Sequence, residues 1–377
     1  MYKILFLPLL RMPSGHHQVA DALMDMLKQR TQGLVLKKID LLSYTNQSLE
    51  KVITGSYLKW IRFAPETYNY AYKSFFYDPA ASDHTFKWYE HIFLKKMQHL
   101  LSEEKPDLIV CTHGFPSHLL SQLKRKGKCD VPVINVYTDF FVNNVWGVEG
   151  IDLHLLPSLE VKQALARNKK IPKSKMIVTG IPIHEEISKN LESPSPIRPK
   201  ILVSGGNSGL GGIQKLSEGL KNSSHFDFLI LCGKNQKLYD QILSWDASHI
   251  KPLPYISSRS EMNSLYDEVD AIFTKPGGVT ISEAIHKRLP IFVHSVLPGQ
   301  EEINLQYLKN NGLIFELDHK KSIDQQIIGV LNNQQRIHHW NRSLNSYLNE
   351  IEVQNPKRLT ELLYWMINHN QTVGRQA

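Results

Sequence analysis

The stretch DAIFTKPGGVTISEA, residues 270–284, joins an apolar run to a segment of helical period, with Gly277 and Gly278 at the junction. A short, continuous apolar run is typical of a strand that is buried on both faces of a parallel sheet. Glycines at a strand-to-helix turn let backbone N–H groups approach an anion, and a helix N-terminus favours negative charge. The stretch therefore predicts a strand–turn–helix unit with an anion-binding turn.

The same alternation of apolar runs and helical segments extends along the whole chain. In residues 19–27, apolar side chains recur at the i, i+3 and i+4 spacing of an amphipathic helix. Such alternation predicts an α/β protein with doubly wound parallel sheets. The predicted strands span residues 2–7, 34–41, 107–112, 131–138 and 176–181 in the first half, and 200–206, 226–233, 270–275, 289–295 and 312–317 in the second.

A proline-rich break divides the chain. The length of 377 residues suits two domains, and the segment NLESPSPIRPK (190–200) carries three prolines without any period, as a linker does. We therefore expect two Rossmann-like domains, residues 1–189 and 201–352. The carboxyl ends of their strands should face a cleft, where ligands bind in open α/β folds.

Composition narrows the class of protein but not its partner. The net charge of +8 suits phosphorylated ligands, anionic lipid or nucleic acid alike. The three cysteines are far apart and indicate neither a disulfide framework nor a metal site, which favours a reducing cytoplasm. No run approaches the ~18 apolar residues of a spanning helix. We expect ILFLPLL (4–10) to be the first strand rather than a signal peptide.

Two further segments in the second half suit a nucleotide sugar. SGGNSGLGG (204–212) is a second glycine-rich turn after a predicted strand, and its glycine order matches neither a dinucleotide fingerprint nor a P-loop. LPGQEEIN (297–304) follows another strand and offers Gln300, Glu301 and Asn304, which can hydrogen-bond sugar hydroxyls. A phosphate cradle beside such a loop indicates a nucleotide sugar.

Each of these segments also has a purely structural interpretation. Strand-to-helix turns often need glycine, and residues 297–304 could form a solvated loop. Thr280 and Glu283 fit a capping box in which Thr280 is the N-cap. The nucleotide-sugar hypothesis is favoured because three such segments follow strands of one predicted sheet.

Several motifs together resemble the family 28 glycosyltransferases and, within them, the processive diacylglycerol glucosyltransferases and the galactolipid synthases. The resemblance spans about residues 1–350 and is most specific over 270–304. It rests on SGHHQVADAL (14–23), YTDF (137–140) with Trp146, VTGIPI (178–183), LCGKN (231–235), TKPGGVTISEA and LPGQEEIN.

The resemblance implies a GT-B fold and a UDP-glucose or UDP-galactose donor that is bound by the second domain. It also implies inversion at the anomeric carbon, no metal, no cofactor, and a terminal helix (353–377) that packs on the first domain. The diphosphate should meet Gly277 and Gly278, the ribose Glu283, and the hexose Gln300 and Glu301. The implied donor residues are Gly206, Ser208, Gly209, Lys234, Asn235, Tyr255, Ile256, Lys275, Gly277, Gly278, Thr280, Glu283, Gly299, Gln300, Glu301 and Asn304.

Sugar transfer to an alcohol needs a base for the acceptor hydroxyl and stabilisation of the departing UDP. His16 is one candidate base, because it follows the first predicted strand and an imidazole pKa of about 6.5 suits neutral pH. Asp139 is the other candidate, and it could instead orient or stabilise charge. Helix N-termini, with Lys275, would stabilise the leaving group. Gly15 and Trp146 are expected on the acceptor side.

An aromatic and basic segment suggests the acceptor. Residues 57–93 hold 13 aromatic side chains, with Lys59, Arg62, Lys73, Lys87, Lys95 and Lys96 in it or just beyond it. Such surfaces suit the headgroup zone of an anionic membrane, and we expect Trp60 and Phe63 to contact it. The alternatives are that the aromatics are core, or that they stack on nucleic acid, for which no module is present. We therefore expect a peripheral protein on the inner face of the cell membrane, with diacylglycerol as acceptor and no nucleic-acid partner.

Three departures from the family pattern leave other functions open. Asn143 stands where a histidine is usual before the tryptophan, His184 and Glu185 stand where arginine and proline are usual, and Ser14 replaces a glycine. A polyprenyl or soluble acceptor therefore remains an alternative, as does a regulatory protein that binds UDP-sugar without turnover. A nucleotide-sugar epimerase fits the PGQE segment poorly.

Overall fold

The computed structural model describes residues 1–9, 14–45, 66–67, 87–188, 198–205, 212–318 and 320–374. The chain forms two compact units. The first comprises Met1–His184, Pro298–Gln300 and Glu350–Ala377, and the second comprises Glu185–Leu297 and Glu301–Asn349. The predicted domain limits, 1–189 and 201–352, stay a prediction, because residues 189–197 lie outside the described residues.

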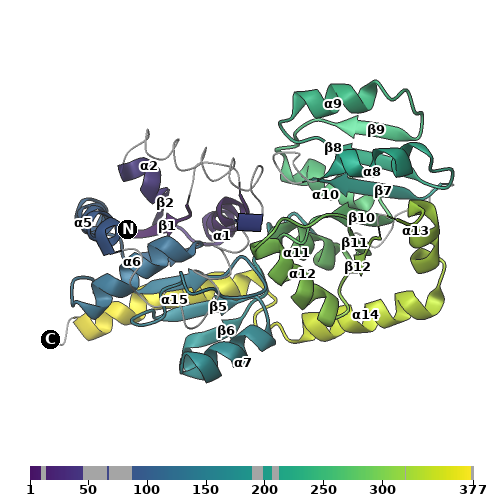
Figure 1. Cartoon of the computed structure of the whole chain (residues 1–377). Helices are drawn as coiled ribbons and strands as arrows, with labels where there is room; N and C mark the ends of the chain where they lie inside the picture. Colours follow the sequence, from purple (N-terminus) through teal and green to yellow (C-terminus); the bar gives the residue numbers. More distant parts are fainter. Residues whose placement is uncertain are drawn as a thin grey trace. The chain divides into compact units, whose positions relative to one another are not determined.

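The first unit contains a six-stranded parallel sheet in the order β2-β1-β3-β4-β5-β6 (Figure 1). Its strands are β1 Tyr2–Leu7, β2 Leu34–Lys38, β3 Leu108–Cys111, β4 Val133–Val136, β5 Leu153–Leu156 and β6 Met176–Val178. Its helices are α1 Gly15–Arg30, α2 Leu41–Thr45, α5 Lys87–Glu104, α6 Gly114–Arg125, α7 Leu159–Asn168, the 3₁₀ turn η2 Lys173–Lys175, and α15 Pro356–Gly374.

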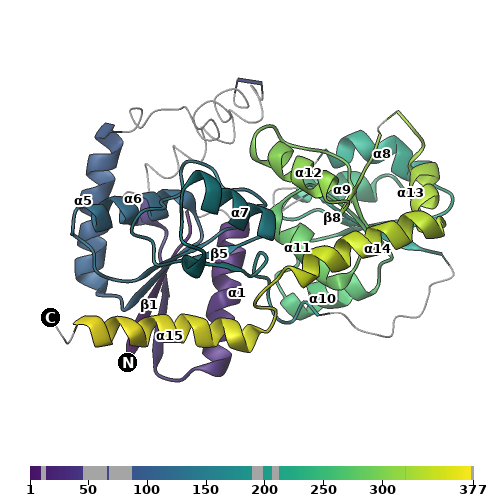
Figure 2. The same ribbon diagram turned by 90° about the horizontal axis from the view of Figure 1, so that it is seen from below.

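Apolar faces hold these elements together. Strands β3, β4 and β5 are buried along their whole length, as their continuous apolar runs predict. The predicted amphipathic helix is confirmed: α1 buries Val19, Ala22, Leu23, Met26 and Leu27. The terminal helix α15 contacts α1 and crosses it (Figure 2), and Tyr364 meets Tyr2 of β1 edge to face at 6.1 Å between centroids.

The second unit contains another six-stranded parallel sheet, in the order β12-β11-β10-β7-β8-β9 (Figure 1). Its strands are β7 Lys200–Ser204, β8 Asp227–Leu231, β9 Ile250–Leu253, β10 Ala271–Thr274, β11 Ile291–Val293 and β12 Phe315–Glu316. Its helices are α8 Ile213–Lys221, α9 Gln236–Leu243, α10 Arg259–Asp267, α11 Gly278–Lys287, α12 Gln300–Asn310 (in this unit from Glu301), α13 Ile323–Leu331 and α14 Gln334–Asn349.

The predicted α/β class with two doubly wound, Rossmann-like sheets is confirmed, but two strands were missed. β5 contains His154 and β9 contains Pro252, and each residue interrupts the apolar run that would indicate a strand. Proline is tolerated in β9 because this strand lies at the edge of its sheet, where one row of backbone groups needs no partner. Cys111, Cys129 and Cys232 are buried, free thiols.

His154 makes the stability of the first unit depend on pH. Its side chain is fully buried, its Nδ1 lies 2.9 Å from the hydroxyl of Tyr137, and burial lowers the pKa of His154 to about 4. Because this pKa lies below the ordinary value, the unfolded chain binds the proton more tightly. The stabilisation is complete above about pH 6.5 and is lost as the pH falls towards 4.

As the pH falls from 7.5 to 5, His154 should lower the free energy of unfolding by about 2 kcal/mol. Urea unfolding at both pH values, on wild type and His154→Gln, measures it. The variant should lose less stability than wild type across this interval. Equal losses in the two proteins would show that His154 does not carry the dependence.

None of the helices in the described ranges is both long enough and apolar enough to cross a membrane.

Candidate functional site

The turn between β10 and α11 has open space beside Gly277, at the place where any other residue would carry its Cβ atom. Gly277 is the N-cap of α11, with φ −85° and ψ 142°, a backbone conformation that any residue can adopt. A Cβ at Gly277 would meet no atom within 4 Å. Neither the backbone nor the packing of the described residues therefore requires glycine here. The N–H of Gly277 donates to the carbonyl oxygen of Lys275 at 2.8 Å, whereas the N–H groups of the first turn of α11, from Gly278 onward, have no partner within an α-helix and can meet a ligand.

The capping-box interpretation of this helix is wrong. Helix α11 begins at Gly278 with Gly277 as its N-cap, so Thr280 is already the third helical residue. Glu283 lies in the second turn, too far along to reach the helix start. The error arose because Thr-x-x-Glu matches the box locally, whereas the buried end of β10 sets the helix start three residues earlier.

Glu283 is a buried carboxylate with a side-chain donor. It is 7% exposed, and its Oε2 accepts a hydrogen bond of 2.8 Å from the hydroxyl of Tyr266, at the end of α10. Burial raises the pKa of Glu283, although the hydrogen bond from Tyr266 opposes this shift. Tyr266 was not predicted from the sequence, because no local pattern distinguishes it from a core aromatic.

Removing the hydroxyl of Tyr266 should destabilise the second unit. Tyr266→Phe leaves a buried carboxylate short of a donor, which should cost about 1–3 kcal/mol of unfolding free energy. Chemical unfolding of Tyr266→Phe measures this cost, and Tyr239→Phe on α9, which is partly buried, is the matched control. A loss no larger than that of the control would contradict the prediction.

Lys275 and Glu301 bring the glycine turn and the loop after β11 together. Lys275 is 9% exposed, its Nζ lies 3.8 Å from Oε1 of Glu301, and burial lowers the pKa of its ammonium group. The backbone N–H of Leu297 donates a hydrogen bond of 2.7 Å to Oε2 of the same carboxylate. Gly299 has a φ of 87°, which favours glycine immediately before α12. Asn304, on α12, is almost completely buried.

Of the remaining predicted donor residues, four lie among the described residues and three lie outside them. The ammonium group of Lys234 lies 5.0 Å from the ring centroid of Tyr255, which is exposed, and Ile256 is half-buried beside it in sequence. Asn235 caps α9 by accepting a hydrogen bond from the N–H of Leu238 at 3.1 Å, so it has a structural role as well. The predicted residues Gly206, Ser208 and Gly209 lie outside the described residues.

In the first unit, His16 lies at the start of α1 against the ends of β3 and β4. Its Nδ1 is 2.9 Å from the carbonyl oxygen of Thr112 and 2.8 Å from Oγ1 of Thr138. Thr138 also lies 3.5 Å from the carboxylate of Asp139. Burial lowers the pKa of His16, and the Asp139 carboxylate opposes this shift. His16 is therefore neutral, as a base must be, at physiological pH.

The predicted acceptor residues are only partly described. Trp146 is half-buried and packs against Tyr137, with ring centroids 4.4 Å apart, so it contributes to the core. Gly15 is the first residue of α1. Trp60, Phe63 and nearly all of residues 57–86 lie outside the described residues. Phe93, at the end of the aromatic segment, is buried and packs against Phe115, as the core alternative predicted.

Comparison with known proteins identifies the class of enzyme. The chain is 39% identical over 372 residues to the uncharacterized glycosyltransferase YkoN of Bacillus subtilis strain 168, covering 97% of this chain and 98% of that protein. This chain belongs to the family 28 glycosyltransferases. The family model for monogalactosyldiacylglycerol (MGDG) synthase matches residues 16–183 of this glycosyltransferase.

More distant relatives agree with this assignment. The glycosyltransferase is 30% identical over 313 residues to a processive diacylglycerol beta-glucosyltransferase of Staphylococcus saprophyticus, covering 79% of this chain and 77% of that protein. The crystal structure of MurG from Acinetobacter baumannii superposes with a TM-score of 0.58 at 14% identity, over 97% of this chain and 99% of that one. The resemblance to MurG concerns the fold, which is GT-B.

Two departures from the family pattern have structural partners in this glycosyltransferase. His184 is buried, and its Nε2 lies 3.4 Å from Oδ2 of Asp25 on α1. Asn143 accepts a hydrogen bond of 3.1 Å from the backbone N–H of Val145, which shapes the turn before Trp146. Both side chains therefore stabilise the first unit locally.

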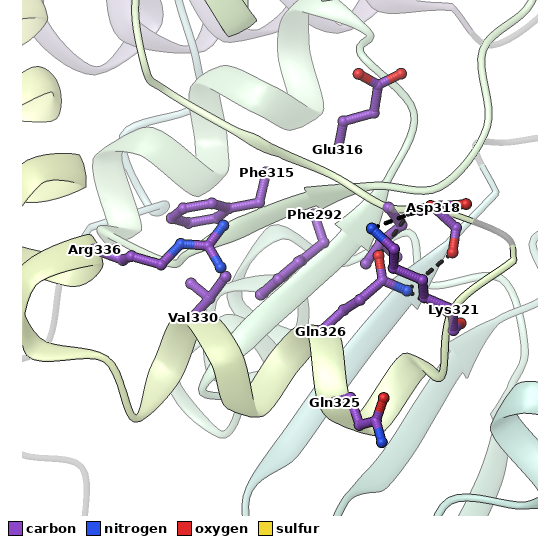
Figure 3. Close-up of a pocket in the computed structure, with 10 residues that line it drawn as sticks. Phe292, Phe315, Glu316, Asp318, Lys321, Gln325, Gln326, Val330 and Arg336 are labelled. Carbon is purple, nitrogen blue, oxygen red and sulfur yellow. Dashed lines mark hydrogen bonds and ion pairs between the residues drawn. The ribbon is translucent and has the colours of Figure 1, made fainter.

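The second unit also contains a cavity away from the predicted donor residues. It has a volume of about 370 Å³ and lies against β11, β12 and α13 (Figure 3). Phe292 and Phe315 line it, and the guanidinium group of Arg336 lies 5.6 Å from the ring of Phe315. Glu316 at its rim is already paired with Lys309 at 2.6 Å. Among the described residues, no predicted donor residue lines this cavity.

Within the described ranges, no group of three or more His, Cys, Asp or Glu side chains is placed to hold a metal ion. A reaction without metal stays a prediction.

Proposed function

We propose that this glycosyltransferase moves a hexose from UDP-glucose or UDP-galactose to a membrane lipid, diacylglycerol, with inversion of the anomeric carbon and without a metal ion. The observation that carries the donor part is the open space at Gly277. A Cβ there would meet nothing, and the position lies at the N-terminus of a ten-residue helix. A diphosphate oxygen fits such a position, because bare backbone N–H groups and the helix dipole both favour an anion.

The second unit supplies most of the groups for donor binding. Glu283, held by Tyr266, is suited to accept hydrogen bonds from ribose hydroxyls. The carboxylate of Glu301 is suited to hexose hydroxyls, and so is the amide of Gln300, which belongs to the first unit and donates a hydrogen bond to the carboxylate of Asp139 there. The charge of Lys275 costs energy to bury, and the carboxylate of Glu301 lies 3.8 Å from its ammonium group. A diphosphate would provide that cation with a closer anion.

The first unit supplies the base. Nε2 of His16 takes the proton of the acceptor hydroxyl as the acceptor oxygen attacks the anomeric carbon. The bond between this carbon and the phosphate oxygen breaks, and the electron pair leaves with UDP. Attack from the face opposite the leaving group inverts the anomeric carbon. Lys275 and the N–H groups at the start of α11, from Gly278 onward, then stabilise the charge on the departing diphosphate.

The acceptor assignment is supported by the relatives. Relatives are named processive diacylglycerol beta-glucosyltransferases, and the matching family model is that of monogalactosyldiacylglycerol synthase. Diacylglycerol resides in a bilayer, so we propose a peripheral protein at the inner face of the cell membrane. The exposed lysines Lys95 and Lys96 of α5 follow the aromatic segment and are suited to anionic headgroups.

The deciding experiment incubates the protein with radiolabelled UDP-glucose or UDP-galactose and anionic vesicles, with and without diacylglycerol. Label in the lipid phase that requires diacylglycerol supports the proposal and identifies the sugar. UDP release with label in a polyprenyl lipid or a soluble alcohol would overturn the acceptor. Binding of the donor without any release of UDP would overturn the reaction itself.

A further inference from the structure

The turn between β3 and α6 places a second imidazole against His16. His113 is the N-cap of α6, and its Nδ1 accepts a hydrogen bond of 3.0 Å from the backbone N–H of Phe115. The rings of His16 and His113 meet edge to face, with centroids 4.7 Å apart and planes at 77°. His16 therefore packs against a ring whose own orientation is fixed by a helix terminus.

The residue before His113 fixes the proton of His16. The carbonyl oxygen of Thr112 lies 2.9 Å from Nδ1 of His16, and a carbonyl can only accept. Nδ1 therefore carries the proton of the neutral ring, and the lone pair is on Nε2. The hydroxyl of Thr138, 2.8 Å from the same Nδ1, can share this proton as a second acceptor.

The turn that carries both contacts has little room to move. Thr112 is fully buried. A Cβ on Gly114, the first residue of α6, would lie only 3.3 Å from the backbone nitrogen of Trp146 and from Val145. The backbone after β3 thus fits closely against residues 145–146. One tightly packed turn orients both the Nδ1 atom and one side of the His16 ring.

We propose that His113 is a positioning residue for the base. Its edge-to-face contact holds the imidazole of His16 in the orientation in which Nδ1–H donates to Thr112 and Nε2 is left for the acceptor hydroxyl. This inference rests on the proposed role of His16, and it adds a residue that acts through His16 rather than on the substrate. Without the contact, the ring can rotate and lose the bond that selects its tautomer.

The charges around the two rings agree with this division of roles. Burial and then the neighbouring His16 hold the pKa of His113 well below its ordinary value, so His113 stays neutral. Burial lowers the pKa of His16, and the Asp139 carboxylate opposes this shift. Both rings are therefore neutral at neutral pH, as the roles of base and positioning residue require.

Two substitutions of His113 separate positioning from helix capping. His113→Asn keeps an excellent N-cap but removes the ring, and His113→Phe keeps a ring but removes the cap. The readouts are the ¹⁵N NMR tautomer of His16, the melting temperature, and kcat and KM against pH. We expect His113→Asn to melt like wild type, to show mixed His16 tautomers, and to lower kcat about ten- to a hundredfold. The acidic limb of its kcat profile should move to higher pH, because water reaches His16.

His113→Phe should keep the Nδ1–H tautomer and most of kcat while melting about 2–4 °C lower. If His113→Asn leaves the tautomer, kcat and the acidic limb unchanged while His16→Asn abolishes transfer, the inference is overturned and the proposed function stands. If His16→Asn transfers sugar at the wild-type rate, the proposed base is wrong. The NMR tautomer then still decides whether His113 orients the ring.

Discussion

Replacing His16 by asparagine will lower kcat by about two to four orders of magnitude, because a positioned general base contributes on this scale. Asparagine is the informative choice. Its amide N–H can still donate to the carbonyl of Thr112, which now lies 2.9 Å from Nδ1 of His16, but it offers no basic nitrogen in place of Nε2. The fold and the donor affinity should therefore survive while proton removal fails.

The matched control is His17→Asn, which changes the neighbouring histidine of the same helix. It should keep kcat within about threefold of wild type, because it leaves Nε2 of His16 and the contact of His16 with Thr112 in place and removes only the small effect of His17 on the pKa of His16. Wild-type activity should fall on the acidic side of neutrality with an apparent pKa below the ordinary 6.5, because burial lowers the pKa of His16. A His16→Asn protein with wild-type kcat would leave Asp139 as the candidate base.

The class of fold and the glycine turn after β10 could be predicted because their signals are local. Val203 and Phe273 stand in apolar runs that lack polar alternation, and such runs can only be buried on both faces. The glycines that follow β10 mark a turn whatever surrounds it. The prediction of strands from local sequence failed for β5, because its central position in the sheet buries His154. A histidine interrupts an apolar run in the sequence, so β5 did not look like a buried strand.

The partners of the candidate base could not be predicted, because they follow from strand order. β1 pairs with β3 so that Leu7 lies opposite Cys111, and the chain then leaves both strands at the same edge. This register brings His16, which follows β1, to Thr112, which follows β3. The contact joins residues 96 positions apart. The sequence indicates each strand, but nothing in a strand's own residues states which neighbour it takes.

Tyr266 illustrates the same limit in the second unit. In the sequence, Tyr266 is indistinguishable from a core aromatic at the end of a helix. The packing of α10 beside α11 brings its hydroxyl to Glu283. Glu283 itself was predicted by resemblance, and its local pattern pointed to a capping role that the structure contradicts. Glu283 lies in the second turn of α11, where it cannot cap the start of the helix. Its buried carboxylate accepts a hydrogen bond from Tyr266 and is better suited to binding a polar ligand.

Replacing Gly277 by alanine should separate stability from donor binding. The backbone at φ −85° and ψ 142° accepts alanine, and its Cβ would meet no atom within 4 Å. Gly→Ala at such a backbone conformation gains about 0.4–1 kcal/mol because the unfolded chain loses conformational freedom. Alanine is a poorer N-cap than glycine by a similar amount, so we expect the stability of the variant to stay close to that of wild type. If the diphosphate occupies that space, the same methyl group blocks it, and the KM for UDP-sugar should rise at least about tenfold.

Isothermal titration with UDP alone and thermal melting measure the two effects on one protein. Gly329→Ala, in helix α13 of the same unit, is the matched control, since a Cβ there would approach only Arg336, at 3.8 Å. Gly277→Ala should melt close to the wild-type temperature and Gly329→Ala at or above it, but only Gly277→Ala should lose affinity for UDP. A Gly277→Ala protein that binds UDP as wild type does would place the diphosphate elsewhere. The open position at α11 would then have no role in the donor site, and the proposal would rest on the glycine-rich turn after β7.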